Sequence, residues 1–226
     1  SYDVTPTASI PVRELNQLNL RAAYHITDDI EIGGSAQFGQ NYNSVMDDSE
    51  FSSAYAGHIV ADFGNFNFKG EYVKYNYNAT DASGADVETV PMGAYGFIYS
   101  VAKEASMYVA GLAYSIDVEM GPISSIQPYV DFTWVDKLND NFEDTYHLIP
   151  GFLVTAGSIY TYVDFALGKN QPWLTENFGV GLGQGRTYSD GVDSDLYYYS
   201  ADPNKIGEPV PISDVEWNLR FNINMG

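Results

Sequence analysis

Residues 215–226 read VEWNLRFNINMG, and apolar and polar side chains alternate along this stretch without a break. Side chains of a β-strand point alternately to the two faces of a sheet, so one face of this segment is apolar and the other is charged or amide-bearing. A strand that crosses a bilayer in a β-barrel needs this pattern over about ten residues. A strand of a soluble sandwich can share it. The apolar positions are Val215, Trp217, Leu219, Phe221, Ile223 and Met225.

The same alternation recurs along the chain and predicts an all-β, antiparallel up-and-down fold. Each predicted strand carries an apolar row opposite a polar row. With residues 215–226 this gives nine strands, and a tenth is predicted near residues 5–12, where Thr5-Pro6 indicates a turn. The other segments are residues 18–26, 30–38, 51–63, 66–72, 108–117, 126–134, 146–156 and 159–167.

The predicted connections alternate between short and long. Turns near residues 27–29, 64–65, 119–125 and 157–158 are short, and the links near residues 43–50, 80–105, 137–144 and 171–214 are longer. Barrels of the outer membrane sort their connections in this way, with turns on the periplasmic side and loops outside. A sandwich has no reason to do so. We therefore predict one transmembrane β-barrel domain over residues 1–226, with residues 80–105 and 171–214 as long extracellular loops.

Composition excludes several classes of protein. The 226 residues carry 30 Asp and Glu against 10 Lys and Arg, a formal net charge of −20, so nucleic acid is not an expected partner. The chain has no cysteine, which removes disulfides and thiolate chemistry. No apolar run approaches the roughly 18–20 residues of a helical span. No secretion leader is visible, so we expect a mature or trimmed chain.

Several motifs in the second half resemble Gram-negative outer-membrane porins of the phosphate-selective O/P type. The resemblance covers roughly residues 18–226 and is strongest over residues 107–173. It implies a sixteen-stranded, trimeric barrel in the bacterial outer membrane, in contact with lipid and lipopolysaccharide, with a constriction loop folded inward. The motifs are Gly121-Pro122-Ile123-Ser124-Ser125, Tyr129-Val130-Asp131, Thr155-Ala156-Gly157, Tyr160-Thr161-Tyr162-Val163-Asp164 and Gly168-Lys169-Asn170-Gln171-Pro172-Trp173.

Two departures from that family stand out. The nine or ten strands are fewer than the resemblance implies, and the sequence stops at Met225-Gly226, slightly before the terminal aromatic residue usual in such barrels. We expect the C-terminal part of a larger porin, and a complete ten-stranded barrel is the alternative. Unpaired strand edges are not tolerated in lipid, so further strands or another chain must complete the cylinder.

The polar rows supply candidate pore-lining residues. If the apolar rows face lipid, these side chains face a wet lumen and set its field and selectivity, although they could also simply fill the interior. Acids outnumber the basic residues, whereas a phosphate pore needs a ladder of Arg and Lys. The sequence therefore favours neutral or cationic solutes. The candidates are Arg21, Lys69, Glu71, Asp131, Asp164, Glu216 and Arg220.

Two loops hold weaker candidates. Residues 90–104 have strand-like propensity but would break the order of connections as a wall strand, so we predict a loop folded into the mouth, with Tyr95, Phe97 and Tyr99 as constriction aromatics. A loop that packs only on itself is the alternative. Asp190, Asp193 and Asp195 are weak candidates for a loop-bound Ca²⁺, and solvated loop charge is the favoured interpretation. No other cofactor is expected.

Nothing in the sequence points to catalysis. The three histidines lie on separate predicted strands and no nucleophile is paired with a base. We expect a porin: a passive or weakly selective diffusion channel for small hydrophilic solutes or ions, and not an enzyme. A non-conducting barrel that serves as an adhesin, a phage receptor or a scaffold around a partner protein is the alternative, and a soluble β-sandwich is the third.

Overall fold

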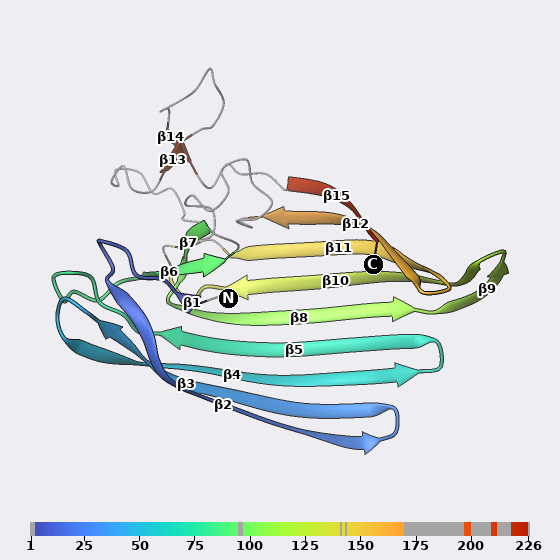
Figure 1. The fold of residues 1–226 in the computed structure, drawn as a ribbon, viewed down its shortest axis with the longest axis horizontal. Helices are drawn as coiled ribbons and strands as arrows, with labels where there is room; N and C mark the ends of the chain where they lie inside the picture. The colour runs from blue at the N-terminus through green and yellow to red at the C-terminus, as the bar shows by residue number, and fades with distance from the viewer. Residues whose placement is uncertain are drawn as a thin grey trace.

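One large antiparallel sheet dominates the computed structural model, which describes residues 3–94, 97–140, 142, 144–169, 197–199, 209–211 and 218–225. Its strands run up and down with the order β15-β12-β11-β10-β8-β5-β4-β3-β2 (Figure 1), and β9 pairs with β10. The strands are β2 (Val12–Thr27), β3 (Ile30–Asn43), β4 (Asp48–Phe63), β5 (Phe66–Tyr77), β8 (Glu104–Tyr114), β9 (Ile116–Met120), β10 (Ile123–Asp136), β11 (Thr145–Ala156), β12 (Ile159–Lys169) and β15 (Asn218–Met225).

All nine strands predicted for the large sheet, here called the wall, are present. Most of them are longer than the segments of alternating apolar and polar residues that predicted them. β2 and β4 have 16 residues each, and β3 and β10 have 14. Among the described residues, β2 and β15 form the two edges of the sheet and do not pair with each other. The all-β, antiparallel, up-and-down prediction is therefore confirmed, and the sheet is open within the part of the chain that the structure describes.

The connections between β2 and β12, which the structure describes, are sorted by end, as predicted. The turns between β2 and β3, β4 and β5, and β11 and β12 lie at one end of the sheet, together with the β9–β10 hairpin (Figure 1). The links over residues 44–47, 78–103 and 137–144 lie at the other. One loop is shorter than predicted: the expected polar link over residues 43–50 shrinks to four residues because β3 and β4 stay paired up to Asn43↔Asp48.

The predicted tenth strand near residues 5–12 is wrong. Residues 5–11 form a turn, in which the Thr7 amide donates to the Ile10 carbonyl at 2.9 Å, and Val12 opens β2. Pro6 and Pro11 lack an amide hydrogen and disfavour a strand here. The short strand β1 (Asp3–Val4) instead pairs with β6 (Thr89–Ala94).

The long link over residues 78–103 contains a second, smaller sheet. β6 pairs with β7 (Phe97–Ala102) and with β1, while β5 pairs directly with β8. Most of residues 90–104 thus form strands outside the wall, in β6 and β7, and only Glu104 belongs to the wall strand β8. The order of the wall strands is kept. A further pair, β13 (Tyr197–Tyr199) and β14 (Pro209–Pro211), lies within the predicted 171–214 loop.

Few described side chains form a conventional apolar core. The buried cluster consists of Val4, Val12, Ala79 and Val90, with Met92 and Val101 among the residues packed against it. This cluster joins the β6–β7 hairpin to one end of the large sheet. No helix among the described residues is long and apolar enough to cross a membrane.

A glycine with a left-handed backbone closes one of the tight turns. Gly64 has φ of 62° and open space around its missing side chain, so Gly64→Ala tests backbone strain alone. We expect this change to lower the free energy of unfolding by about 1 kcal/mol, measured by urea titration. Gly57→Ala is the control, because the nearest atom to its added Cβ is 3.9 Å away. Equal midpoints for the two variants would contradict the assignment.

Candidate functional site

The large sheet has one apolar face and one polar face. The cross-strand register keeps the two apart: Leu20 lies opposite Ala36, and Phe68 lies opposite Leu112. The apolar face, here called the outer face, is exposed to an unusual degree, since Leu112 is 45% exposed. Its large exposed residues are Leu18, Leu20, Tyr24, Ile32, Phe51, Tyr55, Ile59, Phe63, Phe66, Phe68, Tyr72, Tyr108, Leu112, Tyr114, Val130, Phe132, Phe152, Ile159 and Phe165.

Aromatic side chains gather in rows on the outer face. Tyr72, Tyr108, Trp134 and Tyr146 occupy one cross-strand row, with successive ring centroids 5.2, 4.8 and 6.3 Å apart. Three of the four have a hydrogen-bonded polar atom. The Trp134 indole N–H donates to a carboxylate oxygen of Asp144 at 2.8 Å, the Tyr146 hydroxyl donates to the same oxygen at 3.4 Å, and the Tyr72 hydroxyl lies 3.1 Å from Ser106 Oγ. A second group lies towards the short turns.

That second group holds Phe63, Phe66 and Tyr114. Phe63 pairs with Phe66, and the rings of Phe66 and Tyr114 lie 4.6 Å apart. On β8 the residues between the two aromatic groups include Ala110 and Leu112, so aliphatic side chains lie between aromatic ends.

The opposite face, here called the inner face, carries the predicted pore-lining residues that the structure describes with side chains. Lys69 and Asp131 share one cross-strand row, separated by Gly111 on β8. Glu71 lies opposite His58, and Asp164 lies opposite Gly151. Arg220 belongs to β15 at the register position of Ala166, and Glu216 lies outside the described residues.

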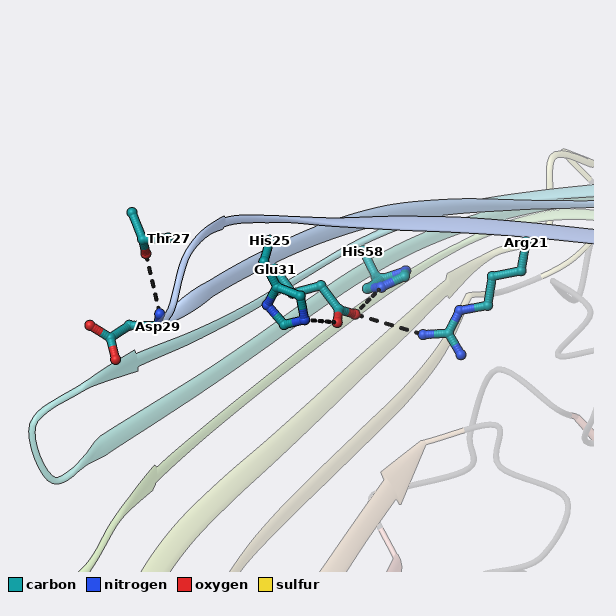
Figure 2. A network of polar contacts seen from close by, with 6 residues as sticks. All are labelled: Arg21, His25, Thr27, Asp29, Glu31 and His58. Carbon is teal, nitrogen blue, oxygen red and sulfur yellow. Dashed lines mark hydrogen bonds and ion pairs between the residues drawn. The ribbon is translucent and has the colours of Figure 1, made fainter.

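A compact ionic network at the β2–β3–β4 end of the inner face was not predicted. Glu31 accepts from His58 Nε2 at 3.1 Å and lies 3.2 Å from His25 Nε2, with the Arg21 guanidinium 3.8 Å away (Figure 2). The sequence placed the histidines on separate strands. The β2–β3 turn, however, makes His25 and Glu31 direct partners, so the register of that turn was the missed signal.

Two imidazoles and one carboxylate in contact (His25, His58 and Glu31) are residue types that could bind a metal ion. Among the described residues, no group of three His, Asp or Glu side chains has the arrangement of a metal site. The Arg21 guanidinium, 3.8 Å from Glu31, already supplies a positive charge beside that carboxylate. The network fits a charged patch on the wall. The Ca²⁺ candidates Asp190, Asp193 and Asp195 lie outside the described residues.

A second polar group lies further along the inner face. The Tyr129 hydroxyl donates to Asp164 Oδ2 at 3.3 Å, and Tyr129 and Tyr162 pack edge to face with centroids 6.4 Å apart. Together with Lys69 and Asp131, the two tyrosines border a hollow of about 250 Å³. Acids and phenols therefore dominate this part of the wall.

Glycines make room for these inner-face side chains. A Cβ added at Gly111 would lie 2.6 Å from Asp131 Oδ1, and one added at Gly151 would lie 2.7 Å from the Tyr129 ring and 2.8 Å from Asp164 Cβ. The polar side chains thus lie flat across glycine on the neighbouring strand. The alternation of apolar and polar residues alone does not reveal this.

Gly151→Ala tests the close packing. Because a rigid ring and a Cβ atom would have to move, we expect a loss of about 1–2 kcal/mol in the free energy of unfolding by urea titration. Gly34→Ala is the matched control, since its added Cβ would meet only the Ala56 carbonyl at 3.4 Å. A loss of similar size in both variants would contradict the packing seen at Gly151.

The β6–β7 hairpin lies on the inner side of the wall. Tyr75 and Tyr77 are odd-numbered residues of β5 and so lie on the same, inner face as Lys69 and Glu71. The Tyr75 hydroxyl donates to the Ala102 carbonyl at 3.0 Å. The Tyr77 amide donates to the Lys103 carbonyl at 2.7 Å. Of the predicted constriction aromatics, Phe97 and Tyr99 belong to β7, and Tyr95 lies outside the described residues.

Two buried asparagines hold the segment that leads into the hairpin. Asn43 Nδ2 donates to Thr80 Oγ1 at 2.9 Å and to the Asp81 carbonyl at 2.8 Å, while Asn43 Oδ1 accepts from the Val45 amide. Asn41 Nδ2 donates to the Asn78 carbonyl at 2.8 Å. In the same loop, hydrogen bonds from Ser83 and the Ala85 amide lower the pKa of Asp81.

Comparison of the chain with protein-family models, curated proteins and solved structures found no match.

Proposed function

We propose that this chain forms part of the wall of a transmembrane β-barrel in the bacterial outer membrane. It acts as a porin for small hydrophilic solutes or ions. The observation that carries the proposal is the continuous, exposed apolar face across eight paired strands, from β2 to β12. At a strand spacing of about 4.8 Å this face is about 34 Å across. Soluble monomers rarely expose an apolar patch of that extent, whereas a barrel in lipid requires one.

The strand lengths and aromatic groups support the same proposal. A strand needs about 9–11 residues to cross a bilayer at the usual tilt, and β2 to β12, without the short β6, β7 and β9, have 11–16. Rings such as Trp134 combine an apolar body with a hydrogen-bonded polar atom, which suits the level of the lipid headgroups. A closed barrel would also satisfy the free edges of β2 and β15.

The charges of the inner face favour cations over phosphate. At inner-face register positions the acids Glu31, Glu71, Asp131 and Asp164 outnumber the basic residues Arg21, Lys69 and Arg220. A wet pore lined with excess carboxylates concentrates cations and repels anions. We therefore propose a weakly cation-selective channel, in which the β6–β7 hairpin narrows the mouth.

Planar-bilayer recording tests this function. We expect stable single-channel steps and, in a KCl gradient, a reversal potential with the sign of cation preference. The double variant Asp131→Asn, Asp164→Asn should lower that preference, because two inner-face charges are removed at constant shape. A clear anion preference of the unmodified channel would contradict the selectivity. The absence of conductance from inserted protein would instead favour a non-conducting barrel that binds a partner.

A further inference from the structure

An apolar hollow lies between the β6–β7 hairpin and the inner face of the wall. Its volume is about 600 Å³, which falls in the range of roughly 300–1,000 Å³ typical of small-molecule sites. The lining of the hollow is unusual for this polar face, because apolar and aromatic side chains predominate. They are Val73, Tyr75 and Tyr77 of β5, Met107 of β8, Met92 of β6 and Val101 of β7.

The hollow is formed by well-anchored parts of the chain. Met92 and Val101 pack with one side against the buried cluster of Val4, Val12, Ala79 and Val90. The β1 pairing adds a backbone hydrogen bond from the Thr5 amide to the Pro91 carbonyl at 2.8 Å. A ligand entering this site would find the apolar surface already assembled, and so would not have to order it.

Two opposite charges border the same hollow. Arg21 and Glu71 both line it, and both also line an adjoining hollow of about 410 Å³. The Arg21 guanidinium is 3.8 Å from Glu31, beyond the roughly 2.7–2.9 Å of a charge-assisted hydrogen bond, and its side chain is 68% exposed. Glu71 forms no ion pair with any residue that the structure describes. Both groups are thus available to a ligand.

An apolar chamber with one cation and one anion at its border matches a particular kind of solute. We propose that the hollow binds a zwitterionic α-amino acid with an apolar or aromatic side chain. The carboxylate binds Arg21, the ammonium binds Glu71, and the side chain packs among Met92, Val101 and Met107. This inference deepens the proposed channel function, on which it rests, because it names a solute class that the channel holds as it passes.

Methionine methyl NMR can test the site without reference to conductance. Protein labelled with ¹³C-methyl methionine in lipid nanodiscs would be titrated with L-phenylalanine, 3-phenylpropanoate and phenethylamine. The second lacks only the ammonium group of phenylalanine, and the third lacks only its carboxylate. We expect chemical-shift changes at Met92 and Met107 only, while Met46 and Met120, which do not line the hollow, serve as internal controls. L-Phenylalanine should bind at least about tenfold more tightly than either analogue, because each analogue loses one charged contact.

Two variants separate the charged contacts. Arg21→Gln should abolish the advantage of L-phenylalanine over phenethylamine, and Glu71→Gln should abolish its advantage over 3-phenylpropanoate. Thr133→Val, a change on the inner face away from the hollow, should alter neither. Equal binding of the three ligands, or equal shifts at Met46, Met92, Met107 and Met120, would overturn the site. If the protein conducts but the Met92 signal does not shift on titration, only the amino-acid site is refuted. If the Met92 signal shifts but inserted protein does not conduct, only the channel function is refuted.

Discussion

Leu112→Arg is expected to destabilise the protein in lipid vesicles by about 2–4 kcal/mol, the cost of an arginine near the middle of the lipid-facing surface of a barrel. Leu112 lies on β8 between the aromatic groups and is 45% exposed in the isolated chain. In water, a change at a position so exposed would cost within about 0.5 kcal/mol. The size of the effect therefore distinguishes hydrocarbon from solvent at this face. Urea titration of the protein in vesicles measures it.

The matched control changes the other face of the same strand. Val109 lies on β8 at the inner-face register, between Glu71 and Thr133. In a barrel, Val109→Arg places the new charge in water and near an acid, so we expect less than about 1 kcal/mol of destabilisation. If Leu112→Arg is tolerated as well as Val109→Arg, the outer face does not contact lipid, and the channel proposal fails with it.

Asn43→Ala is expected to release the segment over residues 78–103 and to lower the free energy of unfolding by about 3 kcal/mol. Asn43 is 2% exposed, and its amide satisfies acceptors at Thr80 and Asp81 as well as donors at Val45 and Met46. An alanine leaves these groups without partners. Hydrogen exchange should accelerate in residues 78–103 while β4 and β10 keep their protection.

A surface asparagine provides the comparison for Asn43. Asn67 Nδ2 donates to one exposed carboxylate oxygen of Asp62 at 2.7 Å, so Asn67→Ala should cost well under about 1 kcal/mol. If the hairpin narrows the channel, Asn43→Ala should also raise the single-channel conductance, and Asn67→Ala should not. Unchanged exchange in residues 78–103 of Asn43→Ala would contradict the anchoring role of Asn43.

The wall of the sheet could be predicted from sequence because its signal is local. Alternation with period two fixes which side chains share a face, and turns such as Gly64-Asn65 fix where the chain reverses. Residues 5–12 misled the prediction for the same reason. Their pattern is too short to outweigh the two prolines, and the segment is placed by contacts with β6 that lie far away in the sequence.

The inner-face groups could be predicted only in part, because they depend on register. The odd or even position of each residue along its strand predicted that Lys69, Glu71 and Asp131 share one face, and the structure agrees for these three residues. The alternation along one strand does not say which residues are neighbours on the next strand. The contact between His58 and Glu31, which are 27 positions apart, was therefore missed. The hollow beneath the hairpin depends on tertiary packing of Met92 and Val101, for which no local pattern exists.

The direct pairing of Asn76 on β5 with Glu104 on β8 makes residues 78–103 an insertion within an otherwise continuous hairpin. The hydrogen-bond ladder of the wall does not pass through this insertion. The length and sequence of this insertion can therefore vary without changing which wall strands pair with each other. In the proposed channel, solute preference and the strand pairing of the wall would then be separately adjustable. A library randomised within this insertion, outside the anchoring residues 78–81 and the buried Val90, would sample new solute preferences on the same wall.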